Sequence, residues 1–512
     1  MRPSPGYRTT TGLAGHRRKC REALLASPWI TDFPAQISAR GEDRSGLTCG
    51  GAGVLPCRTG GGAGKRPGEE RVNGTPIHKA VWIASALAAL LLVPPVSSSR
   101  EYLTITDPNF RPYPIAVPAF KDLGGAKDVA ARARDVLVSD LSITGIFKLL
   151  DPRSFIADQR HEGLSVATIN FNDWINVGAE GLVKVGVLKK GKKVVLDCHL
   201  FDVATGKEAL SKRLEGNARA LRRLVHTFAD SVVRHFTGQP SVFFTKIVFA
   251  KKTKPRSKEI CIMDFDGFGE KCIVRNGSIN LLPAWSADGR GIYYSSYLHG
   301  GPHLYYVDLT TRKTRLVSRA RGLNIGVSAA PDGKRIALTM SKDGNAEIYV
   351  MGTDGSNPRR LTNDWAIDSS PSWSPDSKKI AFVSERAGTP QIYEMAADGT
   401  GVRRLTFQGN YNQTPDWSPR GDWILFNARD ERLVYDIFKI NPESGKIERL
   451  TQDQGNNEHP SFSPDGNLVV FSSTRTGESK LYIMNADGTN QRLISRKKGE
   501  YTTPEWGPWP VK

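Results

Sequence analysis

The stretch PSWSPDSKKIAFVSERAGTPQIYEMAADGTGVRRLT, residues 371–406, consists of short runs separated by turns. Its opening turn has a proline that fixes φ and an aspartate that can bond its own backbone, and related stretches add a glycine that tolerates positive φ. The run Ile380–Val383 is apolar at every position, so both faces of a strand there must be covered. We interpret the stretch as four short strands, with VRRLT as the last.

The same unit recurs through the C-terminal half of the chain. Its aligned central residue recurs every 44 or 45 positions, at Trp285, Ala329, Trp373, Trp417, Phe462 and Trp506. A four-stranded unit that needs a neighbour on each face is a blade of a β-propeller. We expect the aromatic residue to pack between blades, and the aspartates of the turns to form those turns rather than a metal array: Asp288, Asp332, Asp376 and Asp465.

Counting the units predicts a ring of six blades. Five complete blades begin at Pro283, Val327, Pro371, Pro415 and Pro460, whereas residues 245–276 supply only the later strands of an earlier blade. The segment PEWGPW, residues 504–509, offers the missing strand. Pairing the end of the chain into the first sheet removes exposed edges and closes the circle.

The first 99 residues have a different composition. Residues 1–78 are Gly-rich in patches and have no sustained hydrophobic period, so we interpret them as a disordered or non-native extension. Residues 79–99 combine a basic start, the apolar run AVWIASALAALLLV and a small-residue end, which is typical of a signal peptide and too short for a membrane span. We expect translation to start near Val72 and the mature chain near Arg100.

Residues 100–240 predict a small α/β domain before the propeller of residues 241–512. Strands are expected at 114–120 and 147–150, a hairpin at 181–203, and helices at 126–141 and 217–236. The predicted fold is therefore multidomain, with an α/β domain followed by an all-β, six-bladed β-propeller that the C-terminal strand closes.

Catalytic motifs are missing from the sequence. There is no G-x-S-x-G, no H-E-x-x-H and no C-x-x-C, so we expect neither an enzyme nor a cofactor. Function should then lie in the loops between blades, whose amides, hydroxyls and aromatics are typical of a docking surface for a protein or peptide. These loops carry Asn324, Trp365, Asp368, Ser369, Tyr411, Asn412, Gln413, Asn457, Glu458, His459, Tyr501 and Thr502.

Charge and cysteines add two expectations. The chain has 71 basic and 52 acidic residues, but no long basic run follows residue 99, so we expect no nucleic-acid partner. Cys261 and Cys272 lie symmetrically about Asp266 and Gly267, the expected turn of a hairpin, and a disulfide between them is a hypothesis.

The order of these parts resembles the TolB family, the periplasmic propellers of the Tol-Pal system. The resemblance covers residues 101–512: the α/β segment, IMDFDG opening the ring, the WSPDG-type repeats and the terminal PEWGP. It implies a periplasmic, non-enzymatic role in outer-membrane integrity and in the constriction of that membrane at division. It also implies that the ring binds the lipoprotein Pal, which links the chain to the outer membrane, and that we should expect a monomer. An extended N-terminal arm would bind TolA, through Glu101, Tyr102, Leu103, Thr104, Ile105 and Thr106.

Two other classes of function stay open. A propeller enzyme acting on a sugar or lactone needs several carboxylates or histidines at the opening of the ring, where Asp368, Glu458 and His459 are candidates. A binder of anionic polymer needs an affinity that falls steeply with salt.

Overall fold

The structure is a computed structural model that describes residues 110–156, 162–429 and 431–510. The leader, the signal peptide and the arm at Glu101–Thr106 lie outside these described residues, so those expectations stay predictions. Residues Glu101–Lys512 form one compact unit. No helix within the described ranges combines the length and hydropathy needed to cross a bilayer.

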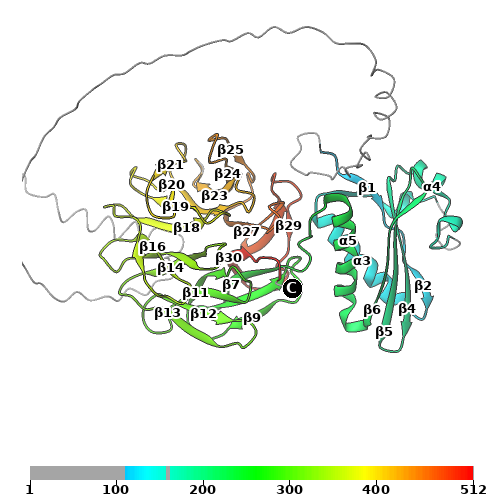
Figure 1. The fold of residues 1–512 in the computed structure, drawn as a ribbon, viewed down its shortest axis with the longest axis horizontal. Helices are drawn as coiled ribbons and strands as arrows, with labels where there is room; N and C mark the ends of the chain where they lie inside the picture. The colour runs from blue at the N-terminus through cyan, green and yellow to red at the C-terminus, as the bar shows by residue number, and fades with distance from the viewer. Residues whose placement is uncertain (1–109, 157–161, 430, 511–512) are drawn as a thin grey trace, which may run out of the picture. The chain divides into compact units, whose positions relative to one another are not determined.

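The first part of this unit is a mixed sheet with helices (Figure 1). Its strand order is β3-β1-β4-β5-β6, with β2 beside β4. Strand β1 pairs in parallel with β3 and β4, and β2 pairs in parallel with β4. Strand β5 pairs antiparallel with β4 and β6. The strands are β1 (Tyr113–Ala116), β2 (Lys121–Gly124), β3 (Phe147–Leu149), β4 (Gly181–Lys190), β5 (Lys193–Asp202) and β6 (Lys207–Asn217). The helices are α3 (Lys127–Ile143), α4 (Phe171–Asn176) and α5 (Leu221–Thr237), with single 3-10 turns at Pro152–Ser154, Val166–Thr168 and Ala218–Ala220.

Helix α5 shows why this sequence folds locally as it does. Its buried Leu221, Val225, Phe228 and Val232 recur every three or four residues, which places them on one side of a helix. Gly238 ends the helix at φ 71°, and its N–H donates to the carbonyl of Arg234 at 2.9 Å. These apolar residues share one core with α3, β4 and β5.

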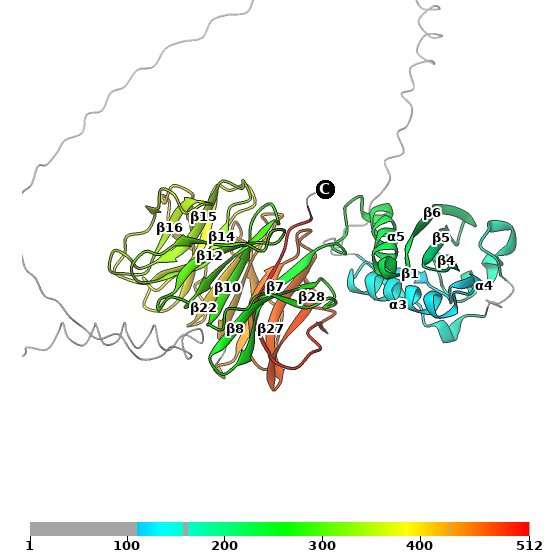
Figure 2. The same cartoon turned by 90° about the horizontal axis from the view of Figure 1, so that it is seen from below.

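The second part is the predicted six-bladed propeller, and the fold prediction is confirmed. Each blade is an antiparallel four-stranded sheet, and strands of neighbouring blades lie side by side, as β7 and β8 do with β27 and β28 in Figure 2. Blade 1 contains β30 (Glu500–Trp506), β7 (Lys246–Lys254), β8 (Ser257–Asp264) and β9 (Lys271–Val274). Blade 2 contains β10 (Asn280–Trp285), β11 (Gly291–Ser296), β12 (His303–Asp308) and β13 (Thr314–Ser318).

Four further blades complete the ring. Blade 3 contains β14 (Asn324–Ala329), β15 (Arg335–Met340), β16 (Glu347–Gly352) and β17 (Arg359–Arg360). Blade 4 contains β18 (Asp368–Trp373), β19 (Lys379–Ser384), β20 (Gln391–Ala396) and β21 (Arg403–Arg404). Blade 5 contains β22 (Asn412–Trp417), β23 (Ile424–Arg429), β24 (Tyr435–Ile440) and β25 (Ile447–Arg449). Blade 6 contains β26 (Asn457–Phe462), β27 (Leu468–Thr476), β28 (Glu478–Asn485) and β29 (Arg492–Leu493).

The last strand closes the ring as expected. Strand β30 pairs antiparallel with β7, so that Tyr501 lies opposite Lys251 and Trp506 opposite Ile247. Its neighbours in space are the first strands of blades 2 and 6, β10 and β26. The N- and C-terminal ends of the propeller therefore share one sheet, and no blade is left with an unpaired inner strand.

The repeated aromatic residue packs between blades, as predicted. Trp373 of blade 4, for example, lies in one core with Ile348 and Val350 of blade 3. The turn aspartates also have the predicted role: Asp376 accepts hydrogen bonds from the Ser374 hydroxyl at 2.7 Å and from the Lys378 N–H at 3.1 Å. The first of these bonds is the main reason that the pKa of Asp376 is lowered.

The residue before the repeated central position joins one blade to the next at five of the six junctions, which the sequence did not predict. Its side-chain oxygen accepts a hydrogen bond from the backbone N–H of the aromatic position one blade further on. The donor–acceptor pairs are Trp373 to Ser328 (3.3 Å), Trp417 to Ser372 (3.0 Å), Phe462 to Asp416 (2.8 Å), Trp506 to Ser461 (3.1 Å) and Trp285 to Glu505 (3.0 Å). We call these bonds the blade latches. At the sixth position Ala284 has no side-chain acceptor.

Contacts also join the α/β part to blades 1 and 6. Arg222 of α5 pairs with Asp266 in the turn after β8, at 2.6 Å between Nη2 and Oδ2. Arg492 of β29 donates to the Ser142 hydroxyl at 2.6 Å and to the Ser142 carbonyl at 2.7 Å. Phe243 and Phe265 share an apolar core with α5. The two parts are thus linked by side-chain contacts as well as by the chain between them.

Candidate docking face

The topology places two sets of loops on the same side of the ring. In an antiparallel four-stranded blade, successive turns alternate between the two ends of the strands. The connections from one blade to the next therefore lie on the same face as the turns between the second and third strands. We call this side the connection face. It contains every loop in which the sequence predicted partner contacts.

One residue at the start of each inner strand is buried at this face. Asn280, Asn324, Asp368, Asn412, Asn457 and Tyr501 occupy equivalent places, and each exposes at most 1% of its surface. Asn324 shows the reason, because its Nδ2 donates to the carbonyl of Ala320 at 2.8 Å and its Oδ1 accepts from the Ser318 hydroxyl at 2.7 Å. These side chains hold the connecting loop onto the strand, which leaves little of them for a partner to contact.

Asp368 is held in the same way. Its Oδ2 pairs with Arg386 Nη2 at 2.7 Å, inside blade 4. Burial raises the pKa of Asp368 to about 6, although the hydrogen bond from Ser384 and the charge of Arg386 act against the rise. The carboxylate is therefore a structural group of the blade.

A β-bulge begins two residues further along each inner strand. The strand pairings shift register there, between Ser369 and Ser372 in blade 4 and between Glu458 and Ser461 in blade 6. The residue at the bulge has a positive φ in all six blades: Leu282, Gly326, Ser370, Thr414, His459 and Thr503. A bulge turns its strand and re-aims the local side chains. Ser369, Glu458 and Thr502, each just before a bulge, are half-buried, and Gln413 in the same place is buried.

Glu458 and His459 have pKa values far from their ordinary ones. Burial raises the pKa of the Glu458 carboxyl to about 7 and lowers the pKa of His459 to about 3. His459 is therefore a neutral ring at physiological pH. Glu458 and His459 lie in blade 6 and Asp368 in blade 4, so the three groups belong to two different blades.

Exposed apolar side chains mark the half of the connection face around blades 3 to 5. Trp365 is 75% exposed, on the connection between blades 3 and 4. Phe407 is 72% exposed on the next connection, with the Arg404 guanidinium 5.0 Å from its ring centre, and Leu433 is 64% exposed in the turn after β23. Among the residues that the sequence proposed, Trp365 is exposed and Tyr411 half-buried. Sequence reasoning missed Phe407 and Leu433, although Phe407 directly follows the VRRLT tail of the repeat.

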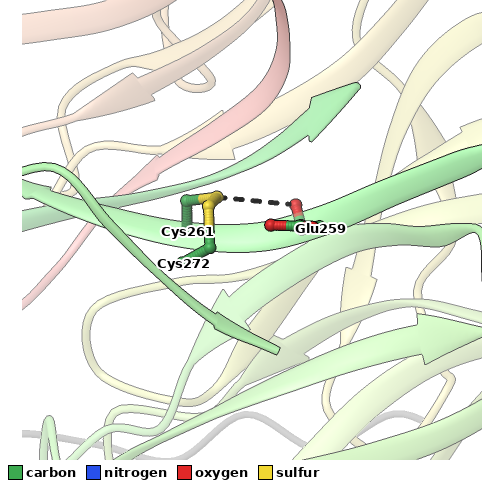
Figure 3. A group of neighbouring side chains, drawn as sticks. All are labelled: Glu259, Cys261 and Cys272. Carbon is green, nitrogen blue, oxygen red and sulfur yellow. Dashed lines mark hydrogen bonds between the residues drawn. A yellow bond between two sulfur atoms is a disulfide. The ribbon is translucent and has the colours of Figure 1, made fainter. Parts of the chain in front are cut away.

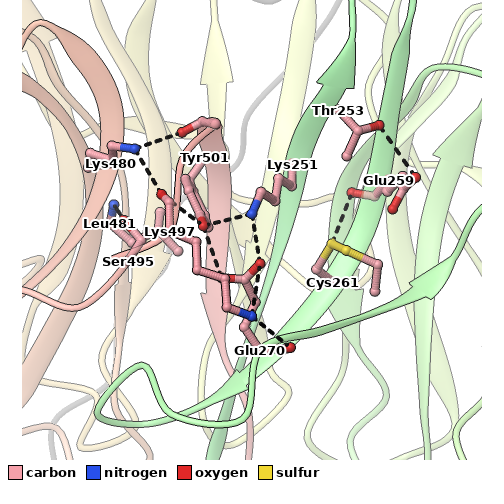
Figure 4. A network of polar contacts seen from close by, with 12 residues as sticks. Lys251, Thr253, Glu259, Cys261, Glu270, Lys480, Leu481, Ser495, Lys497 and Tyr501 are labelled. Atoms are coloured by element: carbon pink, nitrogen blue, oxygen red, sulfur yellow. Dashed lines mark hydrogen bonds and ion pairs between the residues drawn. A yellow bond between two sulfur atoms is a disulfide. The ribbon is translucent and has the colours of Figure 1, made fainter.

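A buried polar network surrounds Tyr501 on the closing strand (Figure 4). Its hydroxyl accepts from Lys251 Nζ at 2.8 Å and donates to Glu270 Oε2 at 2.9 Å, while Lys251 also pairs with Glu270 at 2.7 Å. Burial is the main cause that raises the pKa of Tyr501. Lys480 of blade 6 donates to the carbonyls of Lys497 and Gly499, both at 3.0 Å. Tyr501 is thus part of the ring closure.

Glu259, Cys261 and Cys272 form a group with metal-ligand chemistry (Figure 3). Cys261 and Cys272 are directly paired residues of β8 and β9, and a disulfide joins their sulfurs. Glu259 lies 3.3 Å from Arg275, measured from Oε2 to Nε. Sulfurs bonded to each other are not thiolate ligands, so this arrangement fits a covalent link between strands rather than a metal centre.

The fold defines a class of protein: a six-bladed β-propeller preceded by an α/β domain. A family model described as the TolB beta propeller domain matches residues 233–510, and one described as the TolB amino-terminal domain matches residues 101–209. The chain belongs to the TolB family of the Tol-Pal system.

Individual relatives agree with this assignment. The Tol-Pal system protein TolB of Myxococcus xanthus is 45% identical over 429 residues, which cover 83% of this chain and 99% of that protein. The one of Anaeromyxobacter dehalogenans is 45% identical over 247 residues, and there the match spans 48% of this chain and only 56% of the relative. The crystal structure of TolB from Acinetobacter baumannii is 28% identical, with a TM-score of 0.69 over 78% of this chain and 97% of that one.

Proposed function

We propose that the chain is a non-enzymatic, periplasmic scaffold of the Tol-Pal system. In this proposal the connection face binds the lipoprotein Pal, and the arm at residues 101–106 binds TolA. Together these contacts would support outer-membrane integrity and invagination of that membrane during division. Membership of the TolB family supports the proposal.

The exposed aromatic side chains of the connection face are the structural observation that carries the Pal assignment. Trp365 and Phe407 stand on neighbouring connections and leave about three quarters of their surface to solvent. Large aromatic side chains of this kind supply much of the energy of protein interfaces, because they bury a large area with few rotatable bonds. A partner seated on the face would cover them.

Binding of the soluble domain of Pal from the same organism tests this assignment. Trp365→Ala is expected to weaken binding by about tenfold or more, as anchors of this type do. Leu316→Ala is the matched control, because Leu316 is also exposed but lies on the outer strand β13. Equal losses in the two variants, or none in either, would contradict a Pal site at this part of the face.

The contacts between the α/β part and blades 1 and 6 give a physical route for linkage between the two partners. If Pal and TolA bind to states that differ at these contacts, each changes the affinity of the other by the same factor. Titration of a TolA fragment with and without saturating Pal measures that factor. Identical affinities in the two titrations would remove the coupling and leave a scaffold with independent sites.

An enzyme acting on a sugar or lactone is the weaker alternative. Asp368, its first candidate group, is buried in an ion pair with Arg386, and His459 carries a neutral ring. These states fit structural side chains better than a general acid and base.

A further inference from the structure

Eight exposed basic residues gather on the connection face around blades 6, 1 and 2. They lie in the β7–β8 turn, in the connections that precede β10 and β14, and in the connection that precedes β30: Lys254, Arg256, Arg275, Arg319, Arg321, Arg496, Lys497 and Lys498. We call this set the basic arc. The sequence does not show it, because its members come from four separate segments.

Hydrogen bonds between the loops make the arc continuous. Lys252 pairs with Glu500 at 3.1 Å, which joins the β7–β8 strands to the connection before β30. The Lys258 N–H donates to the Ser278 carbonyl at 3.2 Å, and the Tyr297 N–H donates to the Ile279 carbonyl at 3.1 Å. Asn324 Nδ2 donates to the Pro302 carbonyl at 3.3 Å. Each loop of blades 6, 1 and 2 is thus bonded to the next.

Acidic side chains balance only part of this charge: Arg275 lies 3.3 Å from Glu259, and Lys497 lies 4.0 Å from Glu270. The segments 253–258, 275–279, 297–302 and 318–323 contain no acidic residue, and the segment 494–500 contains Glu500, which already pairs with Lys252. In the other half of the face, each of three bases has a close acidic partner: Lys342 with Asp343, Arg386 with Asp368 and Arg432 with Asp453. The connection face therefore carries its larger excess of positive charge on the side of blades 6, 1 and 2.

We propose that the basic arc binds an acidic segment of a partner polypeptide, an inference that rests on the proposed function and specifies the chemistry of that partner. The bases are distributed over four segments around the opening instead of converging on one point. That distribution matches charges spread along an extended acidic chain better than a single phosphate group. Trp365 stands on the next connection around the ring, so apolar side chains beside the acidic segment would reach it.

Charge complementarity of this kind mainly accelerates association, and it weakens as salt screens it. The association rate of the partner should therefore fall as NaCl rises from 50 to 300 mM. A variant that reverses part of the arc should bind more slowly and lose most of this salt dependence.

The test compares two variants of the full-length chain with equal changes in net charge. The arc variant is Lys254→Glu, Arg256→Glu and Lys498→Glu. The control is Lys313→Glu, Lys334→Glu and Lys378→Glu, three exposed bases in turns on the opposite face. The probes are the soluble domain of Pal, a fluorescein-labelled poly-L-glutamate peptide, and vesicles of phosphatidylglycerol or phosphatidylcholine. Thermal unfolding confirms that both variants are folded.

The proposal expects about tenfold slower association of Pal with the arc variant and an unchanged rate with the control. An arc variant that binds Pal at the wild-type rate overturns the inference and leaves the proposed function intact. If the wild-type chain does not bind Pal, the proposed function fails. In that case, poly-L-glutamate binding that is weaker in the arc variant and unchanged in the control still supports an acidic polypeptide ligand. Arc-dependent binding of phosphatidylglycerol vesicles without binding of either polypeptide overturns the inference in favour of a lipid surface.

Discussion

Glu505, near the end of the chain, accepts a hydrogen bond from the backbone N–H of Trp285, with 3.0 Å between Oε1 and N. The two residues are 220 positions apart, and the bond latches blade 1 to blade 2. Burial raises the pKa of Glu505 well above its ordinary value, and the charge of Asp416 adds to the rise. The carboxyl group that joins blade 1 to blade 2 therefore holds its proton more tightly than a free glutamate does.

Removal of residues 504–512 should destabilise the whole propeller. The deletion takes away Glu505, its bond to Trp285, and Trp506, which packs in the core shared by blades 1 and 6. Without this segment the inner edge of β7 loses much of its partner strand. We expect a large fall in the melting temperature, measured by circular dichroism. Glu505→Gln keeps an acceptor oxygen and should have a melting temperature close to that of wild type. A deletion variant with the wild-type melting temperature would show that the C-terminal strand does not stabilise the ring.

The stability of the ring should fall as pH rises from 5 to 8. Burial raises the pKa of Asp416 to about 7 from an ordinary value near 4, so the folded state holds this proton more tightly than the unfolded chain. The folded state gains from that difference at low pH and loses the gain as pH passes through about 7. Asp416→Asn keeps the acceptor for the Phe462 N–H and removes the titration.

Urea unfolding of this variant at pH 5 and at pH 8 measures the effect. We expect the stability of Asp416→Asn relative to wild type to be higher at pH 8 than at pH 5. The difference in free energy of unfolding between wild type and variant could instead be the same at pH 5 and pH 8. That result would show that Asp416 does not titrate in this range.

The blade latches should be individually measurable. Ser372→Ala removes the acceptor for the Trp417 N–H and should cost about 1 kcal/mol, the usual net value of one hydrogen bond. Ala284→Ser tests the reverse, because Ala284 occupies the one latch position without an acceptor. We expect it to leave stability unchanged or raise it by up to about 1 kcal/mol. A larger loss in Ala284→Ser than in Ser372→Ala would argue against the latch interpretation.

Reduction of the Cys261–Cys272 disulfide should weaken ring closure. The link holds β9 against β8, and Glu270, just before β9, binds both Lys251 and Tyr501 of blade 1. The chain-entropy model gives about 3 kcal/mol for a loop of this length. We expect a lower melting temperature in dithiothreitol, and no such shift in a Cys261→Ala, Cys272→Ala double variant.

Thiol titration checks the disulfide directly. A chain that begins at Arg100 contains three cysteines, Cys198, Cys261 and Cys272. Unfolded without reductant, it should show one free thiol, that of Cys198. Three free thiols would mean that the cysteines are not bridged in the native protein.

Regular local patterns predicted most of the fold. The 44-residue spacing and the apolar strands gave the blade number correctly, and the pairing of residues 504–506 with β7 followed from the unfilled first blade. Strand β6 was missed, because Lys207–Asn217 has many charged residues and no long apolar run. Its partner β5 supplies the register that makes it a strand. Helix α5 accordingly begins at Leu221, later than the predicted Asn217.

The candidate site was less predictable from the same residues. A polar residue in a connecting loop has the same sequence signature whether its side chain faces a partner or bonds its own loop. Asn324, Asn412 and Asn457 were proposed as contacts, and the structure shows them buried. Their contact role stays a prediction, as does that of the arm at Glu101–Thr106.

The sequence alone determined the repeat, the blade count and the closing strand, because turn residues and apolar strands act over distances of a few residues. Tertiary structure decided which side chains remain exposed and which charges lie together. The basic arc illustrates the difference, since Arg256 and Lys498 are far apart in the chain and lie on linked loops only because β30 pairs with β7. Electrostatic attraction depends on distance in space, and that distance exists only after the ring has closed.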